Sequence, residues 1–307
     1  MRGARGSSGR GRPVLGLLLV VLLGQSAVAD LFADATSSSE TDSAPADSKA
    51  DKPYWRQNLF GRFFRDQKFL FTDWWPSEFR RYQFTGPLLA GIALAAAPGR
   101  GSEEGPDLEA ETYVKNESAE SGNSVARGFS TLGNAGPAVL LLGAGYLIGR
   151  TGHNDRLAEA SSLSAEALLS SGLYCTVLKK VTARTRPTDG SDGRFFSYHP
   201  QQGEVVGSFP SGHATGAFTV ATVFAETYKD KKWIPWVAYG TAGMIGLSRM
   251  SLGRHFAGDV IVGGLLGHSI GRMVTARQRD SRQARFEIQP YFDPAGAEAG
   301  VVWTRRW

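Results

Sequence analysis

Cysteine is almost absent from this chain of 307 residues, which contains Cys175 alone. A single thiol excludes an internal disulfide and any zinc or iron–sulfur site built from several cysteines. The chain also lacks an uninterrupted apolar run of the ~20 residues that a membrane-spanning helix needs, and its mean hydropathy is −0.21. Glycine is frequent, with 38 residues, but it has no three-residue period, which excludes collagen. The length suits one or two domains with a sizeable core.

A strong excess of one charge is also missing once the N-terminus is set apart. The chain carries 34 basic and 29 acidic residues, but four of its arginines fall within residues 1–13, which contain no acid. An apolar run of 11 residues follows over 14–24, and then Ala27-Val28-Ala29. This order predicts a cleavable secretory signal over residues 1–29, with a retained N-terminal anchor as the alternative. Cleavage leaves 30 basic and 29 acidic residues, so we expect no nucleic-acid partner. An exported chain without disulfides is typical of a bacterial periplasm, where we expect the mature protein.

The composition changes twice after the predicted signal. Residues 30–53 are rich in Ser, Ala and Asp and have little apolar surface to bury, so they predict a disordered linker. Twelve aromatic residues then crowd into residues 54–84, interleaved with six arginines and lysines. We expect residues 54–83 to form an arm that packs its rings on the domain, and a segment lying on a membrane surface is the alternative.

Six apolar stretches of helical length follow, and they predict an all-α fold. They cover residues 84–97, 135–149, 162–180, 212–228, 233–248 and 258–274, with a loop expected over 98–126. Their uninterrupted apolar centres reach only about 12–15 residues. Buried helices of a compact multi-helix bundle over residues 84–282 therefore explain them better than six membrane crossings. Two short strands around an Asp-Pro-Ala-Gly turn predict a C-terminal β-hairpin within residues 283–307.

The first of three informative blocks is basic. Lys179 and Arg186 are seven residues apart, or two helical turns, so we expect both side chains on one face of a helix that Pro187 ends. Two like charges on one stripe repel each other unless an anion lies between them. A solvated basic face explains the same pattern.

The second block, Pro210-Ser211-Gly212-His213, precedes a helix of small and apolar residues. Ser211 can cap this helix, and Gly212 lets the backbone approach a ligand closely. The free N–H groups and the positive end of the helix dipole form an anion site. His213 lies in the first turn beside it. A capping serine with an incidental histidine is the alternative interpretation.

In the third block, His255 and Asp259 are four residues apart, which predicts that they share one face of a helix. The carboxylate can then accept the Nδ1–H of the imidazole and leave Nε2 as a nucleophile. Arg249 adds a planar guanidinium that suits phosphate oxygens. The pair could instead bind a metal, but the remaining histidines have no ligand-like spacing: His153, His199 and His268. We therefore expect no metal.

In chain order, the three blocks are Lys-x6-Arg-Pro, Pro-Ser-Gly-His and Ser-Arg-x5-His-x3-Asp. This order resembles the type 2 phosphatidic acid phosphatase / vanadium haloperoxidase superfamily, in its exported bacterial acid-phosphatase-like form. The resemblance covers the helical region from about residue 84 to residue 275, and every motif position matches. It implies a helical bundle and a metal-independent phosphohydrolase that uses no cofactor and forms a phosphohistidine.

The same resemblance implies a cradle for the phosphoryl group. Its oxygens would bind the side chains of Lys179, Arg186 and Arg249. The side chain of Ser211 and the backbone N–H of Gly212 would complete the cradle. Three cations that face a transferring phosphoryl group supply the charge stabilisation that this reaction chiefly needs.

The catalytic roles implied by the resemblance fall to three residues. His255 would attack phosphorus, Asp259 would hold its ring in the required tautomer, and His213 would protonate the leaving oxygen and then activate water. The expected substrate is a lipid phosphate, a lipid diphosphate or another phosphoester, and the expected partner surface is a membrane that the protein contacts peripherally. A vanadium-dependent haloperoxidase and a non-catalytic phosphate- or lipid-binding envelope protein are the alternatives.

Overall fold

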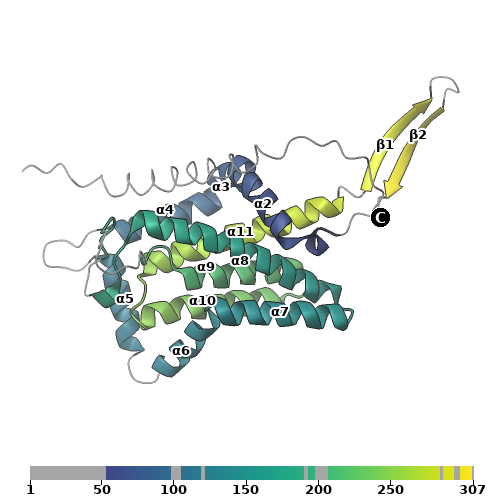
Figure 1. The fold of residues 1–307 in the computed structure, drawn as a ribbon. Helices are drawn as coiled ribbons and strands as arrows, with labels where there is room; N and C mark the ends of the chain where they lie inside the picture. The colour runs from purple at the N-terminus through teal and green to yellow at the C-terminus, as the bar shows by residue number, and fades with distance from the viewer. Residues whose placement is uncertain are drawn as a thin grey trace, which may run out of the picture.

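The computed structural model describes residues 53–97, 105–118, 122–189, 193–197, 207–283, 286–293 and 298–305. The signal predicted over residues 1–29 lies outside the described residues, as does all but the last residue of the linker predicted over 30–53. The described chain forms an all-α bundle followed by one pair of strands (Figure 1).

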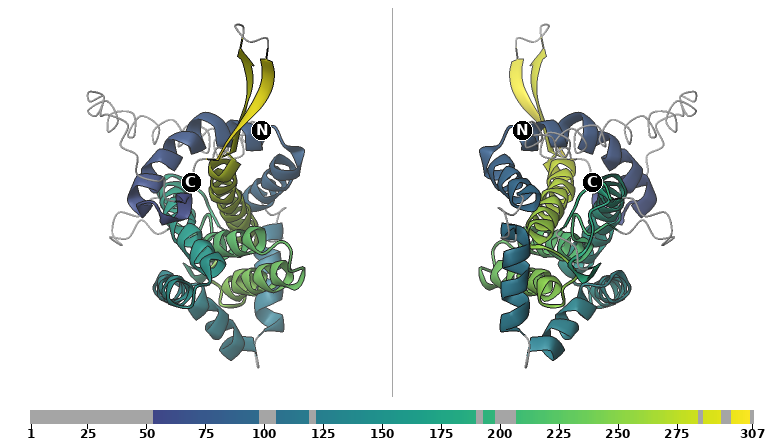
Figure 2. Two further views of the ribbon diagram at one scale, coloured as in Figure 1. Left: turned by 90° about the vertical axis from the view of Figure 1, so that its right-hand side faces the viewer. Right: turned by 90° about the vertical axis from the view of Figure 1, so that its left-hand side faces the viewer.

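The bundle is built from ten helices among the described residues. They are α2 (Leu59–Phe69), α3 (Trp75–Phe79), α4 (Tyr82–Ala96), α5 (Pro106–Glu117), α6 (Gly122–Leu132), α7 (Ala135–Thr151), α8 (Asp155–Thr182), α9 (Gly212–Thr227), α10 (Trp233–Ser251) and α11 (Ala257–Gln283). Strands β1 (Phe286–Asp293) and β2 (Glu298–Arg305) pair antiparallel, with Phe286 opposite Arg305. This hairpin projects from the C-terminal end of α11 (Figures 1 and 2).

The prediction of a loop over residues 98–126 is wrong, because α5 and the start of α6 lie within this range. Helix α5 carries ordinary end signals: Pro106 begins it, Asp107 and Glu109 lie in its first turn, and Lys115 lies in its last. These charges favour the two ends of the helix dipole, and proline suits the first helical position. The segment has no long apolar stretch, so a search for apolar helices missed it.

The aromatic arm shares the core of the bundle. Tyr54, Trp55 and Trp75 are buried, and the ring of Trp75 lies 6.0 Å from that of Phe84 and 5.8 Å from that of Tyr174. Helices α2 and α3 lie on the side of the bundle from which the hairpin projects (Figures 1 and 2). Some rings of the arm therefore pack on the domain, whereas those of Phe60, Phe64 and Tyr82 are exposed.

Helices α9 and α11 pack closely because glycines line the face of α11 that meets α9. A Cβ atom at Gly267 would lie 2.1 Å from the carbonyl oxygen of Thr215, and one at Gly263 would lie 2.7 Å from that of Ser211. Glycine alone permits such an approach of two backbones. As a result, the two helix starts lie together, and the backbone N–H of Ser211 donates to the carbonyl oxygen of Asp259 at 2.9 Å.

Among the described residues, no single helix has both the length and the apolar composition to cross a membrane. Residues 124–132 of α6 and helix α7 have this length and composition only when they are taken together, and the two segments are bent by 58° relative to each other.

Candidate active site

The predicted site residues gather at one end of the bundle, where two helices end and two begin. Lys179 lies in the last turn of α8 and Arg249 in the last turn of α10. His213 lies in the first turn of α9, and Asp259 in the first turn of α11. The fold thus collects side chains that are up to 80 residues apart in the chain.

His255 lies in the loop before α11, with its Nδ1 3.4 Å from Oδ2 of Asp259. The expected pairing of these two residues is present, but a shared helix face is not its cause, because α11 begins only at Ala257. The carboxylate is fixed instead by the backbone N–H of Phe256, which donates to the same oxygen at 3.0 Å. An Nδ1–H that faces this carboxylate leaves the lone pair of the ring on Nε2.

The start of α9 forms the second part of the site. Ser211 caps the helix as expected, since its side chain accepts the backbone N–H of Ala214 at 3.5 Å. A Cβ atom at Gly212 would lie 3.9 Å from Cε of Lys179, so the backbone at this helix start lies directly beside the lysine. The ammonium group of Lys179 donates to the carbonyl oxygens of Gly207 and Ser208 at 2.8 and 3.2 Å.

The prediction that Lys179 and Arg186 share one face of a helix is wrong. Helix α8 ends at Thr182, and Ala183 adopts the left-handed conformation with φ 39° and ψ 47°. Arg186 therefore lies beyond the helix, and Pro187 begins a separate 3-10 turn instead of ending α8. Lys179 and Arg186 still lie near enough to interact. Burial lowers the pKa of Lys179, and the charges of Arg186 and Arg249 add to this effect against those of Cys175 and Asp259.

Two residues that no sequence motif indicated hold members of the site. Ser130 of α6 accepts a hydrogen bond from Nη1 of Arg249, and Oδ1 of Asn134, before α7, lies 2.9 Å from Nε2 of His213. In the part of the chain that the structure describes, Nε of Arg249 is buried without a hydrogen-bond partner.

The electrostatics of the site favour an anionic ligand. Burial, together with the charges of Arg249, His255 and Lys179, lowers the pKa of His213 to about 4. Burial also lowers the pKa of His255 to about 4, against the effect of its hydrogen bond to Asp259. Both imidazoles are therefore neutral near pH 7, while lysine and arginine side chains stay cationic, and such a site attracts a phosphoryl group.

Arg184 is a further residue of this site, and no sequence motif indicated a role for it. Its guanidinium lies 2.5 Å from Oδ1 of Asp259 and 2.7 Å from Oδ2 of Asp107, and its side chain is 1% exposed. Burial raises the pKa of Asp259, but the charges and hydrogen bonds of Arg184 and His255 together outweigh burial and hold that pKa well below its usual range. The only signal in the sequence was the place of Arg184 within the same basic block, between Lys179 and Arg186.

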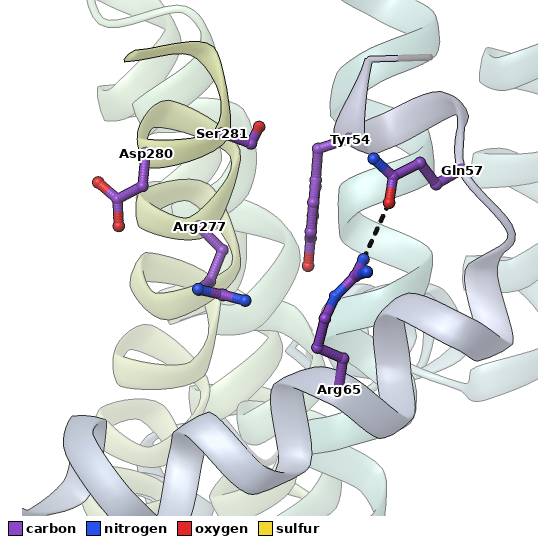
Figure 3. Close-up of a pocket in the computed structure, with 6 residues that line it drawn as sticks. All are labelled: Tyr54, Gln57, Arg65, Arg277, Asp280 and Ser281. Carbon is purple, nitrogen blue, oxygen red and sulfur yellow. Dashed lines mark hydrogen bonds between the residues drawn. The ribbon is translucent and has the colours of Figure 1, made fainter. Parts of the chain in front are cut away.

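A pocket of about 340 Å³ lies elsewhere (Figure 3). It is lined by Tyr54, Gln57, Arg65, Arg277, Asp280 and Ser281. Arg277 is 18 residues after Asp259 on α11, which separates the pocket from the predicted site by about 27 Å. Throughout the described ranges, no group of three or more His, Cys, Asp or Glu side chains is placed to hold a metal ion.

Known proteins resemble this chain across the predicted site. The family model of the PAP2 superfamily (type 2 phosphatidic acid phosphatase) matches residues 162–283, which include every predicted site residue. Phosphatidylglycerophosphatase B of Bacillus subtilis is 31% identical over 156 residues, which cover 47% of this chain and 70% of that protein. Lipid A 1-phosphatase of Rhizobium etli is 38% identical over 96 residues, which cover 30% of this chain and 39% of that protein.

The chain spans less than half the length of the lipid A 1-phosphatases that it matches. Among solved structures, the first transmembrane PAP2 type phosphatidylglycerolphosphate phosphatase, from Bacillus subtilis, matches with a TM-score of 0.49 and 25% identity. That match covers 65% of this chain and 98% of the other.

Proposed function

Because the chain belongs to the PAP2 superfamily, we propose that it is a phosphatase that removes a phosphate from a phosphorylated lipid through a phosphohistidine and without a metal ion. The observation that carries this proposal is the pairing of the buried His255 with Asp259 at the bundle end that also holds Lys179, Arg249 and His213. A buried imidazole held by a carboxylate and facing cations suits nucleophilic attack on a phosphoryl group.

In the first half of the reaction, the Nε2 lone pair of His255 forms a bond to phosphorus while the ester P–O bond breaks. The leaving oxygen takes the proton of His213, and Asp259 stabilises the charge that His255 gains. An approaching phosphate dianion raises the pKa of His213, which lets this residue carry the proton. In the second half, His213 removes a proton from water, the water oxygen bonds to phosphorus, and the N–P bond breaks to release inorganic phosphate.

The cradle around the phosphoryl group needs no metal ion in this proposal. Lys179, Arg186 and Arg249 neutralise the oxygens, and the buried Nε of Arg249 supplies a donor without another partner among the described residues. Ser211 and the backbone N–H of Gly212 add the positive end of the α9 dipole.

A lipid substrate is supported by apolar side chains on the outer faces of two helices. Leu140 of α7 is 74% exposed and Trp236 of α10 is 82% exposed, and further exposed apolar residues on these helices are Val139, Leu141, Leu147, Ile148, Trp233 and Val237. Clusters of exposed apolar side chains mark contact surfaces. We infer that these faces contact the periplasmic side of a membrane. The names of the relatives, lipid A 1-phosphatase and phosphatidylglycerophosphatase B, also favour a lipid.

Phosphate release by the purified chain tests the proposed chemistry. Wild type should hydrolyse para-nitrophenyl phosphate and lipid phosphates in EDTA, with orthovanadate as an inhibitor. His255→Asn should abolish turnover with an unchanged circular dichroism spectrum, whereas His153→Asn, at an exposed loop histidine, should keep it. More than a few per cent of wild-type kcat in His255→Asn, or activity that zinc or magnesium must restore, would contradict the mechanism.

Vesicle binding tests the proposed membrane contact. Replacing Leu140 and Trp236 together by Asp should release the chain from anionic lipid vesicles. Tyr82→Asp is the matched control, because Tyr82 is an exposed aromatic residue of the N-terminal region with 81% exposure. Loss of binding in Tyr82→Asp alone would assign the contact to the N-terminal region instead. Carbonate extraction of membranes should release the wild-type chain into the supernatant.

A further inference from the structure

The left-handed turn at the end of α8 directs Arg184 into the bundle. Ala183 has a positive φ of 39°, a conformation that is unfavourable for a residue other than glycine. Arg184 follows it, and its guanidinium lies 4.3 Å from the ring centre of Phe256 and 4.8 Å from that of Phe195. Two aromatic rings thus pack against the guanidinium, in addition to its hydrogen bonds.

Four hydrogen bonds fix the guanidinium within that plane. Nε donates to the carbonyl oxygen of Gly193 at 3.0 Å, and Nη1 donates to Oδ1 of Asp259 at 2.5 Å. Nη2 donates to Oδ2 of Asp107 at 2.7 Å and to the carbonyl oxygen of Ala95 at 3.0 Å. Arginine has five N–H donors, so almost all of its capacity is used within the protein.

Arg184 therefore differs from a phosphate ligand. Arg249 keeps a buried Nε with no partner among the described residues, whereas the donors of Arg184 are directed at Asp259, Asp107 and two backbone carbonyls. Its side chain is also 1% exposed, so it lies behind Asp259 instead of facing a ligand. What it can act on is Asp259.

Asp107 attaches the same arginine to the turn that carries Asp259. Its Oδ2 accepts from Arg184, and its Oδ1 accepts the backbone N–H of Gly258 at 2.7 Å. This N–H belongs to the first turn of α11, where the backbone donors have no partner within the helix. Two buried carboxylates, Asp107 and Asp259, thus share one guanidinium, and the link runs from α5 through Arg184 to His255.

We propose that Arg184 and Asp107 are positioning residues of the reaction, acting through Asp259 on the nucleophile His255. This inference rests on the proposed function of His255. Arg184 holds Oδ1 of Asp259, which turns Oδ2 toward Nδ1 of His255. The negative charge of Asp107 offsets part of the positive charge of Arg184. The carboxylate of Asp259 is therefore less neutralised and can better stabilise a positive His255.

The two residues have opposite electrostatic effects on His255. Loss of Arg184 removes a cation from behind Asp259, so His255 should bind its proton more tightly. Loss of the Asp107 charge leaves the positive charge of Arg184 to act on Asp259 alone. Asp259 then stabilises a protonated His255 less, so His255 should bind its proton less tightly. The other charged and titratable groups that act on His255 or on its neighbour His213 stay in place in both variants: Lys179, Arg186, Arg249, His213 and Asp259.

The test compares Arg184→Gln with Asp107→Asn in the full chain. The proton affinity of His255 is read by NMR of the histidine side chains, with His255→Asn to assign the signal, and the pH profile of kcat/KM is measured beside it. We expect the pKa of His255 to rise by about one unit in Arg184→Gln and to fall by about one unit in Asp107→Asn. In both variants, kcat should fall about 10- to 100-fold with little change in KM, as for other residues that hold a catalytic group in place.

Two controls separate positioning from folding. Arg184→Lys keeps the charge without the planar fork, so the pKa of His255 should stay near that of wild type while kcat falls. Arg62→Gln removes another buried arginine, which lies 3.3 Å from the buried Glu166. Glu166 precedes Lys179 by 13 residues on α8, about 20 Å along the helix, so this variant should leave the pKa of His255 unmoved.

Equal or absent pKa changes in Arg184→Gln and Asp107→Asn would overturn the inference and assign both residues to folding alone. A comparable change in Arg62→Gln would overturn it as well. The NMR measurement does not depend on turnover. Opposite pKa changes in a chain without phosphatase activity would therefore support the link to His255 and reject the proposed function.

Discussion

Nε2 of His213 lies 2.9 Å from Oδ1 of Asn134, although the two residues are 79 positions apart in the chain. Asn134 precedes α7, and His213 lies in the first turn of α9. An amide oxygen only accepts hydrogen bonds, so this contact favours a proton on Nε2 of His213. In the proposed mechanism, this contact holds the ring of His213 in place while the protonated imidazole gives up its additional proton to the leaving oxygen.

Asn134→Asp should extend the activity of the enzyme on alkyl phosphates to higher pH. A carboxylate beside His213 raises the pKa of this histidine, which burial and nearby cations lower to about 4, by at least one unit. Since the acid works in its protonated form, the basic limb of kcat/KM should move upward by about the same amount. An aryl phosphate has a good leaving group and needs little acid help, so its profile should not move. Equal shifts for both substrates would argue against His213 as the acid.

Arg249→Lys should lower kcat/KM by about 10²-fold, the scale for losing one donor to the transition state. The charge is retained, but an ammonium cannot replace the planar fork, and the buried Nε is lost. Arg254→Lys is the matched control, because Arg254 lies in the following loop with an exposed side chain. The inhibition constant of orthovanadate should weaken in Arg249→Lys alone. Similar losses in the two variants would show that the effect is not specific to the guanidinium of Arg249.

Gly267→Ala should destabilise the bundle and reduce activity, because its Cβ atom would lie 2.1 Å from the carbonyl oxygen of Thr215. Overpacking of this kind costs about 1–3 kcal/mol, and it pushes the start of α9 away from Asp259. Gly240→Ala on α10 is the control, since nothing lies within 4 Å of its Cβ position, and alanine favours a helix over glycine. Thermal unfolding should show a lower Tm for Gly267→Ala and an equal or higher one for Gly240→Ala. A wild-type Tm in both variants would contradict the close packing of α9 on α11.

Glu166 should make the protein less stable as the pH rises from about 4.5 to about 8. Its carboxyl is buried, and burial, together with the charge of Asp66 and against that of Arg62, raises its pKa from 4.5 to about 8. The hydroxyl of Tyr54 has one proton but lies beside carboxyl oxygens of both Asp66 and Glu166. A proton on Glu166 lets both of these contacts be hydrogen bonds. Between these pH values the unfolded chain releases that proton and the folded chain keeps it. The free energy of unfolding therefore falls by up to about 1.4 kcal/mol per pH unit.

Urea unfolding of Glu166→Gln at pH 5, 6, 7 and 8 measures this effect. The amide keeps a hydrogen-bonding group but does not titrate, so the variant should lose the part of the slope that wild type owes to Glu166. Glu117→Gln, at an exposed carboxyl of α5, should keep the wild-type slope. Parallel pH profiles for wild type and Glu166→Gln would mean that Glu166 is already ionised in the folded chain.

Some features of this protein were predictable from the order of its residues. The apolar stretches predicted an all-α bundle, because a buried helix must be apolar over several turns wherever it lies. The Ser211 cap of α9 is likewise a local interaction within four residues. Helix α5 carried equally local signals in Pro106, Asp107 and Lys115, but a search for apolar stretches did not use them.

Interactions between distant segments were decided only by the tertiary structure. The sequence placed His255 beside Asp259 by helical spacing, yet His255 lies in a loop. The contact depends on the backbone N–H of Phe256 and the guanidinium of Arg184, which hold the carboxylate of Asp259. No local pattern indicated Asn134 or Asp107, because a hydrogen bond or an ion pair across the bundle leaves no periodic mark in the chain. Such contacts exist only after the helices pack. By itself, the sequence determined which chemical groups the site would have, and helix packing decided which partners hold them.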